Sequence, residues 1–468
     1  MLKRMPTGVP GFDTILGGGL FKRGVYIFEG PPGVGKTTLA NQIAYEHARQ
    51  GAAALYVTML AESHARMLQH MEGQTFFDRS FVNSRVLYLS GYKDFEQGGL
   101  KGVVNLLRGE IERSGASLLI VDGLVVEGQQ HNTGDAVRQF VHELQSLVSA
   151  LACTCLLLTS GRGSTSSAEQ TMVDGIFAFE DRTFHWRAER RIQVRKFRGG
   201  RVLRGDHTFC ITDEGLQFFP RLEALPWEAT GVAQGPVASV SSGLRALDAV
   251  LHAGGLYAAS NSVLIGQSGT GKTTVALAFA SQCDVKAPSL LMACTESSDE
   301  LRRLGGEVGI AVGEAVDTGA LKIQQLGLED ESMDEMGHKV LRMVDEVKVS
   351  RLVVDGLAGL ADTLAFPERG YRFLGRLLGE LKKRGVTSLF TVDPDALAIA
   401  AGTPLADGVV GWFDNAFTLA PIGADGEDRE RRLTVMKARG NSAHALGVDI
   451  RLPSMTSARS AHSSLTAD

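Results

Sequence analysis

One phosphate-loop pattern, GxxxxGK[ST], occurs twice in this chain and constrains its fold more than any other feature. It is met by GPPGVGKT, residues 30–37, and by GQSGTGKT, residues 266–273. Each copy follows a short apolar run and precedes a segment of helical period, which is the context that such a loop requires. The glycines let backbone N–H groups turn inward around phosphate oxygens, and the following helix N-terminus adds partial positive charge. Two copies in register predict two phosphate-binding domains.

The residue types in the loops indicate which group contacts which part of a nucleotide. Lys36 and Lys272 are expected to neutralise the β- and γ-phosphates, while the hydroxyls of Thr37 and Thr273 are expected to reach Mg²⁺. For a single loop, the alternative is a glycine-rich turn that matches the pattern by chance. Two loops in register make a chance match negligible. The nucleotide-binding residues predicted in this way are Gly30, Gly33, Gly35, Lys36, Thr37, Thr38, Gly266, Gly269, Gly271, Lys272, Thr273 and Thr274.

The repeat extends well beyond the two loops. TGVPGFDTILGGGL precedes the first loop and SSGLRALDAVLHAGGL precedes the second, while SLLIVDG and RLVVDG follow at matching distances. Single cores rarely grow beyond about 250 residues, so 468 residues also favour two domains. We expect a first domain at 1–228, a linker at 229–240, a second domain at 241–453, and a Ser/Thr-rich disordered tail at 454–468.

Within each copy, short apolar runs alternate with longer segments of helical period, as in ALYVTM followed by ESHARMLQHMEG. This alternation predicts an α/β fold. The apolar runs are continuous rather than alternating, which indicates burial on both faces and hence a mostly parallel sheet covered by helices.

Composition limits the kind of partner and compartment. Hydrophobic residues make up 44% of the chain, and no stretch supplies the roughly 18 uncharged apolar residues of a membrane span, so we expect a cytoplasmic protein without a membrane partner. The formal net charge of −5 offers no overall attraction to nucleic acid. Cys153 and Cys155 lie in the apolar run LACTCLLLT, where core packing is a better prediction than a metal pair.

Carboxylates at strand ends are the candidates for metal binding and for catalysis. Asp122 and Asp355 each end an apolar run and are predicted to hold the magnesium shell, usually through water. A helix-capping aspartate is the alternative. Glu62 and Glu296 follow the strand after each phosphate-loop helix and are candidates for activating the attacking water, although a first-turn charge on a helix is also plausible.

Taken together, these segments resemble the KaiC family of RecA-like ATPases in its double-domain form. The resemblance is carried by TGVPGFDTILGGGL, the strand-end AES and TES, the two aspartates, KFRGG and KARGN, and RGDHTFCITDEGLQFFPRLEA. It implies two tandem RecA-like domains that use ATP and Mg²⁺, and a homo-oligomer, expected to be a hexamer, with ATP between neighbouring subunits.

The resemblance also assigns a role to four cations. Lys196 and Arg198 in the first copy, and Lys437 and Arg439 in the second, match the Lys-x-Arg-Gly motif with which family members reach the nucleotide of the adjacent subunit. Cations supplied across an interface would stabilise charge on the transferring phosphoryl group. A solvated basic strand edge is the alternative.

Two departures from the family pattern concern catalysis. Clock members have adjacent glutamates at the strand end, whereas the first of these positions is Ala61 in one copy and Thr295 in the other. Their Ser-Thr phosphorylation pair falls on Val410 and Gly411, which carry no hydroxyl. We therefore expect an oligomeric Mg²⁺-dependent ATPase that acts as a nucleotide-driven switch for an unidentified signalling partner, and an autokinase of the clock type is an alternative without its acceptor pair.

Two further alternatives stay open. A RecA-like DNA-binding ATPase would line its ring pore with basic or aromatic loops, but GRGSTSSAEQTMVDG and DPDALAIAAGTPLADGVVG hold a single arginine and no aromatic residue. This argues against a nucleic-acid partner. A non-hydrolysing scaffold, in which ATP joins subunits, is compatible with the missing first glutamates.

Overall fold

The computed structural model describes residues 3–59, 64–123, 134–160, 172–184, 187–226, 238–326, 331–357, 369–394, 410–422, 430–440 and 446–451. The chain divides into two compact units, Met1–Leu225 and Pro226–Asp468. Most of the predicted linker and all of the predicted tail, 454–468, lie outside the described residues.

The first unit is built on a nine-stranded sheet in the order β11-β10-β9-β8-β3-β7-β6-β4-β5. The strands from β8 to β5 are parallel, and β9, β10 and β11 continue the sheet in antiparallel fashion. The strands are β3 (Val25–Glu29), β4 (Ala54–Thr58), β5 (Val86–Ser90), β6 (Leu118–Asp122), β7 (Thr154–Thr159), β8 (Gly175–Phe184), β9 (Arg187–Phe197), β10 (Asp206–Thr212) and β11 (Gly215–Phe219).

The second unit repeats this arrangement with an eight-stranded sheet in the order β16-β15-β17-β18-β14-β19-β20-β21. Its first six strands are parallel and its last two antiparallel. The strands are β14 (Asn261–Ile265), β15 (Ser289–Ala293), β16 (Leu321–Gln325), β17 (Arg351–Asp355), β18 (Thr387–Val392), β19 (Asn415–Pro421), β20 (Glu430–Lys437) and β21 (Leu446–Arg451). The predicted pair of mostly parallel α/β domains is confirmed.

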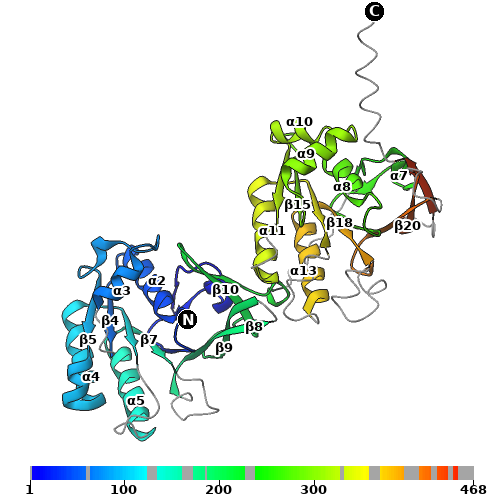
Figure 1. Ribbon diagram of the computed structural model, residues 1–468. Helices are drawn as coiled ribbons and strands as arrows, with labels where there is room; N and C mark the ends of the chain where they lie inside the picture. The colour runs from blue at the N-terminus through cyan, green and yellow to red at the C-terminus, as the bar shows by residue number, and fades with distance from the viewer. Residues whose placement is uncertain are drawn as a thin grey trace, which may run out of the picture. The chain divides into compact units, whose positions relative to one another are not determined.

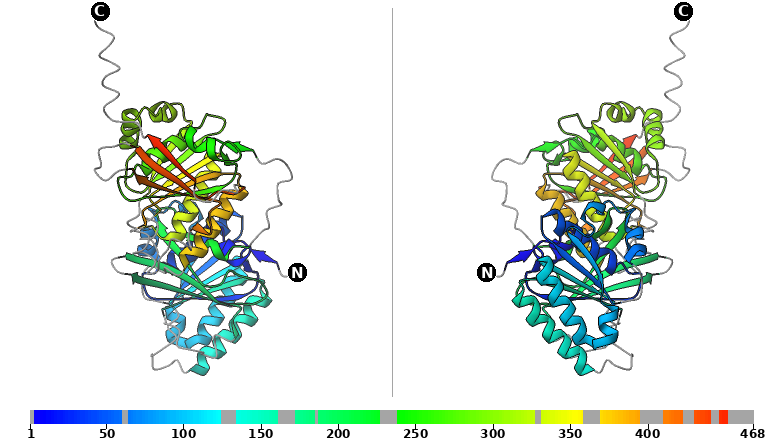
Figure 2. Two further views of the ribbon diagram at one scale, coloured as in Figure 1. Left: turned by 90° about the vertical axis from the view of Figure 1, so that its right-hand side faces the viewer. Right: turned by 90° about the vertical axis from the view of Figure 1, so that its left-hand side faces the viewer.

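Helices cover both faces of each sheet. In the first unit they are α2 (Lys36–Arg49), α3 (His64–Met71), α4 (Tyr92–Ser114) and α5 (Gly134–Ala150), and in the second α8 (Lys272–Ala280), α9 (Ser298–Glu307), α11 (Met333–Val347) and α13 (Gly370–Lys383). Figure 1 shows α4 beside α5, and α11 beside α13, and the views of Figure 2 show the same pairs. None of the helices in the described part of the chain is long and apolar enough to cross a bilayer.

Two apolar cores explain why the strands of the first unit read as continuous apolar runs. Tyr26 and Phe28 of β3 pack with α2, whereas Val25 and Ile27 pack with α4 and α5 on the other face. Each fully buried Leu, Ile or Phe side chain contributes roughly 2 kcal/mol, so a strand buried on both faces needs apolar residues at every position. The sulfurs of Cys153 and Cys155 lie in the second of these cores, which confirms the packing prediction.

The parallel strands end at one edge of each sheet, and this edge positions the sites. In open α/β sheets, ligands bind beyond the carboxyl ends of the strands. The first phosphate loop follows β3 there, and Asp122 ends β6 at the same edge. In the second unit the loop after β14 and Asp355 at the end of β17 are placed in the same way.

Candidate functional site

Both phosphate loops have the backbone that their glycines were predicted to allow. Gly33 and Gly35 have φ of 80° and 107°, and Gly269 and Gly271 have φ of 78° and 97°. A side chain would be strained at such angles. The helix begins directly afterwards, so that Lys36–Thr38 and Lys272–Thr274 form the first turns of α2 and α8.

The two loop lysines fold back over their own loops. Lys36 Nζ donates to the carbonyl oxygens of Gly30 at 2.7 Å and Pro31 at 2.9 Å. Lys272 Nζ donates to Gly266 O at 2.7 Å and Gln267 O at 2.8 Å. Burial lowers the pKa of Lys36, and the carboxylate of Asp122 acts in the opposite direction. The geometry brings each lysine to the centre of its loop.

Asp122 is held by two hydroxyl groups on one of its oxygens. Thr37 Oγ1 donates to Asp122 Oδ2 at 3.0 Å, and Tyr56 OH donates to the same atom at 2.6 Å. The structure thus brings the predicted metal pair of the first copy, Thr37 and Asp122, into direct contact.

Asp355 is held differently. Thr391 Oγ1 donates to Asp355 Oδ1, while Oδ2 is buried and accepts no hydrogen bond from the described residues. Burial raises the pKa of Asp355, and the hydroxyls of Thr391 and Thr273 counteract this rise. A buried carboxylate oxygen without a protein donor, close to a threonine hydroxyl, fits a hydrated Mg²⁺, which prefers oxygen ligands and keeps several waters.

The structure describes one of the two candidate bases, Glu296. Glu62 lies outside the described residues. Glu296 accepts a hydrogen bond from Thr295 Oγ1 at 2.6 Å and is near enough to Asp355 to raise the pKa of that residue. It also adds to the rise in the pKa of Cys294 to about 12, which burial and Asp355 mainly cause. Glu296 therefore lies on the phosphate-loop edge of the second sheet.

The segment that carries each glutamate differs in length between the copies. Thr58 pairs with Asp122, and Ala293 pairs with Asp355, so the two strands end at equivalent positions. The next helices begin at His64 and Ser298. Glu62 is the fourth residue after Thr58 and Glu296 is the third after Ala293, so the sequence of the first unit has one more residue before its glutamate.

In each unit the Lys-x-Arg motif leads away from the phosphate loop, from beside the middle of the central strand to beside its start. Lys196 pairs with Ile176, which pairs with Ile27, the middle residue of β3. Beyond Lys196 the strand runs away from the loop, and Arg198 N donates to Asp174 O at 2.7 Å, beside the first residue of β3, Val25.

The second unit places its cations in the same way. Lys437 Nζ donates to Phe413 O at 2.6 Å, and Arg439 donates to Asp414 Oδ1 at 3.0 Å. Asp414 in turn accepts from the backbone N–H of Asn261, where β14 begins. In both units the arginine of the motif thus lies beside the start of the central strand, whereas the phosphate loop follows its end.

An ion pair beside the first phosphate loop was not predicted. Glu29, the last residue of β3, is 5% exposed, and Arg195 donates to its Oε1 at 2.5 Å. Burial raises the pKa of Glu29, which Arg195 opposes. Arg195 is the extra residue of a β-bulge next to Lys196. The sequence offered one signal for this ion pair, which is the charged Glu29 at the end of an apolar run. The hydroxyl-bearing Tyr56 within the apolar run ALYVT was a similar signal for the contact with Asp122.

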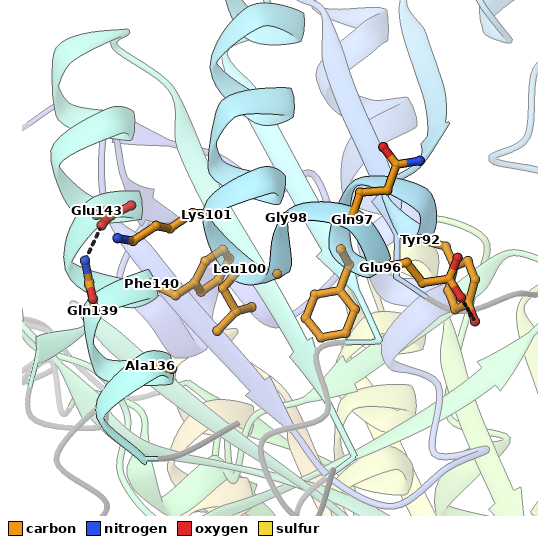
Figure 3. A pocket seen from close by; sticks show the side chains of 12 residues that line it. Tyr92, Glu96, Gln97, Gly98, Leu100, Lys101, Ala136, Gln139, Phe140 and Glu143 are labelled. Carbon is orange, nitrogen blue, oxygen red and sulfur yellow. Dashed lines mark hydrogen bonds between the residues drawn. The ribbon is translucent and has the colours of Figure 1, made fainter. Parts of the chain in front are cut away.

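A separate cavity of about 630 Å³ lies between the first turns of α4 and α5 (Figure 3). Phe95, Leu100 and Phe140 provide its apolar side chains, and Gln139 donates to Glu143 at its rim. Helix α4 is kinked here because Gly99 has φ 59° and ψ −152°. None of the predicted site residues lines this cavity.

Comparison with known proteins identifies the family. The family model described as "ATPase: KaiC" matches residues 5–223 and 240–448. Circadian clock oscillator protein KaiC of Picosynechococcus sp. is 25% identical over 462 residues, covering 96% of this chain and 87% of that protein. Circadian clock oscillator protein KaiC 1 of Synechocystis sp. is 24% identical with the same coverage.

A further relative belongs to the same group. Circadian clock protein KaiC2 of Synechocystis sp. is 24% identical over 457 residues, covering 94% of this chain and 78% of that protein. Two family segments, two RecA-like sheets and two phosphate loops at matching sheet edges agree with one another. This chain therefore belongs to the KaiC family of ATPases, in the form with two tandem ATPase domains.

Proposed function

We propose that this protein is an oligomeric, Mg²⁺-dependent ATPase in which each nucleotide is held by the phosphate loop of one subunit and completed by the Lys-x-Arg motif of its neighbour. The observation that carries this proposal is that the motif leads away from the loop at residues 30–35, since Lys196 is level with the middle of β3, two strands away, and Arg198 lies beside its first residue. The five-residue strand spans about 16 Å, which is too far for the side chain of Arg198 to serve the nucleotide of its own domain.

When nucleotide binds, the loop lysine would exchange its hydrogen bonds to loop carbonyl oxygens for hydrogen bonds to phosphate oxygens. A triphosphate offers Lys36 Nζ charged acceptors, which form stronger hydrogen bonds than the two loop carbonyls that it contacts. Thr37 and Asp122, and Thr273 and Asp355, would hold Mg²⁺, which when bound neutralises charge on the phosphate oxygens. Lys196, Arg198, Lys437 and Arg439 would place further positive charge against the leaving phosphoryl group of the neighbouring subunit.

Hydrolysis needs a base that orients water, and Glu296 is our candidate in the second domain because it lies near Asp355. Glu62 is the corresponding candidate in the first. An ATP-joined scaffold without hydrolysis remains the competing function, since Thr295 and Ala61 stand where clock relatives have a further glutamate. The autokinase is disfavoured because Val410 and Gly411, which stand where clock relatives have their phosphorylation pair, carry no side-chain hydroxyl to accept a phosphoryl group.

Mixing two inactive variants tests the shared site. Lys36→Ala removes the loop cation and Lys196→Ala removes the cation for the neighbouring subunit, both in a Lys272→Ala chain so that only first-domain sites count. We expect neither variant alone to release phosphate from ATP, and a mixture to regain activity because some interfaces contain both lysines. A mixture that stays inactive although light scattering shows mixed oligomers would contradict the proposal.

Labelling with γ-³²P ATP separates the competing functions. Phosphate release without labelled protein supports the ATPase switch. Label on the protein would establish an autokinase, and bound ATP with neither release nor label would establish the scaffold. Size-exclusion chromatography with light scattering, with and without ATP, tests whether the assembly is a hexamer that nucleotide stabilises.

A further inference from the structure

A buried network of polar side chains lies beneath the first phosphate loop. Tyr56 is fully buried and donates its hydroxyl to Asp122 Oδ2 at 2.6 Å, where Thr37 also donates at 3.0 Å. These are the two residues of the first domain that we assign to Mg²⁺. Tyr56 is thus in direct contact with one of them and shares its acceptor atom with the other.

A second branch of this network reaches Thr37 from behind. Asn41, also fully buried, donates through Nδ2 to Thr37 O at 2.9 Å. Tyr88 donates its hydroxyl to Asn41 Oδ1 at 2.9 Å, and its ring lies 5.5 Å from that of Tyr56. Both sides of the metal pair are therefore fixed by side chains that the core holds in place.

The second domain replaces every supporting member of this network by an apolar residue. Asn41 is the fifth residue after Lys36, and Leu277 is the fifth after Lys272. Tyr56 pairs with Tyr88 across β4 and β5, and the equivalent pair across β15 and β16 is Leu291 with Ile323.

Asp355 takes its hydroxyl from the opposite neighbour instead. Thr391 on β18 donates to it, and the residue that pairs with Asp122 on β7 is Leu158. Besides the loop hydroxyl of Thr273, the second domain thus supports its aspartate from the β18 side, whereas the first uses a network from the β4 side.

Burying three polar side chains in a core is costly unless each is satisfied, and a satisfied network fixes one arrangement of its members. Outer-shell partners of metal ligands set their orientation, and their loss typically costs 10–100-fold in metal affinity. Tyr56 and Asn41 contact Asp122 and Thr37 directly, and Tyr88 joins Asn41 to Tyr45, although Leu and Ile at the equivalent positions suffice to pack the second domain.

We propose that Tyr56, together with Asn41 and Tyr88, is a positioning element that holds Thr37 and Asp122 ready for Mg²⁺, so that the first domain binds Mg-ATP at lower Mg²⁺ concentration than the second. The inference rests on the proposed function in that it takes both loops to bind ATP with Mg²⁺. It adds a difference between the domains and names the residues that cause it.

The test measures Mg²⁺ dependence of nucleotide binding in the full-length chain. A Lys272→Ala chain reports the first domain and a Lys36→Ala chain the second, with the fluorescence of a methylanthraniloyl ATP analogue followed against Mg²⁺ and in EDTA. We expect half-saturation at lower Mg²⁺ in the Lys272→Ala chain. Adding Tyr56→Phe should raise its half-saturating Mg²⁺ about tenfold and leave binding in EDTA within about twofold.

Tyr26→Phe is the matched control. Tyr26 is also fully buried in the first domain, and its hydroxyl bonds the backbone of Phe21, at a distance from the loop. The control should lower thermal stability without changing the Mg²⁺ midpoint. Equal midpoints in the two parent chains, an unchanged midpoint in Tyr56→Phe, or an equal shift in Tyr26→Phe would each overturn the inference.

Two further outcomes are distinguishable. If the Lys272→Ala chain binds no analogue at any Mg²⁺ concentration, the proposed function of the first domain fails as well. If Tyr56→Phe does not fold, Tyr88→Phe carries the test, because it removes only the hydroxyl that donates to Asn41. A rise of about threefold in the Mg²⁺ midpoint is expected there, and no rise would overturn the inference.

Discussion

The two nucleotide domains share a strand order and a phosphate loop, but the residues around that loop differ in polarity. The first domain has Tyr56 and Asn41 beneath the loop and the Glu29–Arg195 ion pair beside it. The second has Leu291 and Leu277 beneath the loop, Ile265 at the end of β14, and Met436 at its β-bulge.

This difference shows that a duplicated site can keep its phosphate-loop residues while the residues beneath the loop change. The loop glycines, lysines and threonines agree because phosphate chemistry requires them. Residues one layer behind them need only fill space or satisfy each other, so both polar and apolar solutions occur in the one chain. Their consequences are measurable separately, because each loop can be disabled alone.

The largest expected effect separates the two sites. Lys36→Ala and Lys272→Ala should each weaken nucleotide binding at one domain about 100-fold, since charge-assisted contacts of about 3 kcal/mol are lost. Calorimetry should then count one strong site per chain in place of two. Lys286→Ala, an exposed lysine of the second unit, is the control. Two strong sites in either loop variant would contradict the assignment.

Removing the arginine of the ion pair should be the next largest effect. Arg195→Met leaves Glu29 buried without its cation and should destabilise the first domain by about 2 kcal/mol, because an unpaired buried charge is costly. Glu29→Ile with Arg195→Met copies the second domain and should recover most of this. Urea unfolding combined with hydrogen exchange of residues 25–49 measures it. A double variant no more stable than Arg195→Met would show that the pair matters for another reason.

Asp355 should depend on a hydroxyl from β18, whereas Asp122 depends on one from β4. Thr391→Val removes the hydroxyl that donates to Asp355 and accepts from Gly356 N, and should cost about 1.5 kcal/mol of stability in the second domain. It should also raise the pKa of Asp355 further, since that hydroxyl favours the charged form. The control is Thr318→Val, an exposed hydroxyl in the same unit. Equal unfolding midpoints for Thr391→Val and the parent chain would contradict the predicted contribution of this hydroxyl to stability.

The smallest expected effect concerns pH. Hydrogen bonds from Asn261 N and Lys382 hold the pKa of Asp414 below its ordinary value although burial alone would raise it. A lowered folded-state pKa adds stability above about pH 4 that is lost as pH falls through the folded-state value. Asp414→Asn should therefore cost about 1 kcal/mol near neutral pH, and the gap should close in acid. A gap that is constant from pH 7 to pH 3 would exclude this linkage.

Fold and ligand-facing loops were predictable from the sequence because their signals are local. The phosphate loops, the strand-end aspartates and the continuous apolar strands each occupy a few consecutive residues. The contact of Thr37 with Asp122 joins residues 85 positions apart, yet it follows once both lie at one sheet edge. Glu62 remains a prediction, because it lies outside the described residues.

The supports of the two sites could not be predicted in the same way. Tyr56, Asn41 and Tyr88 come from three elements, and nothing in their sequence spacing indicates that they meet. Which of Asp122 and Asp355 is held from the β4 side or the β18 side also depends on strand order, which sequence alone left open.

The sequence by itself determined the duplication, the α/β class, the family and the residues of the two phosphate loops, because each depends on residue type within a short window. Only the tertiary structure decided that the Lys-x-Arg motif leads away from its own loop, with its arginine at the far end of the central strand, and that a polar network supports Thr37 and Asp122 while apolar residues stand at the equivalent positions of the second domain. Those facts depend on the register between strands and on which side chains share a core, and both are set by long-range packing.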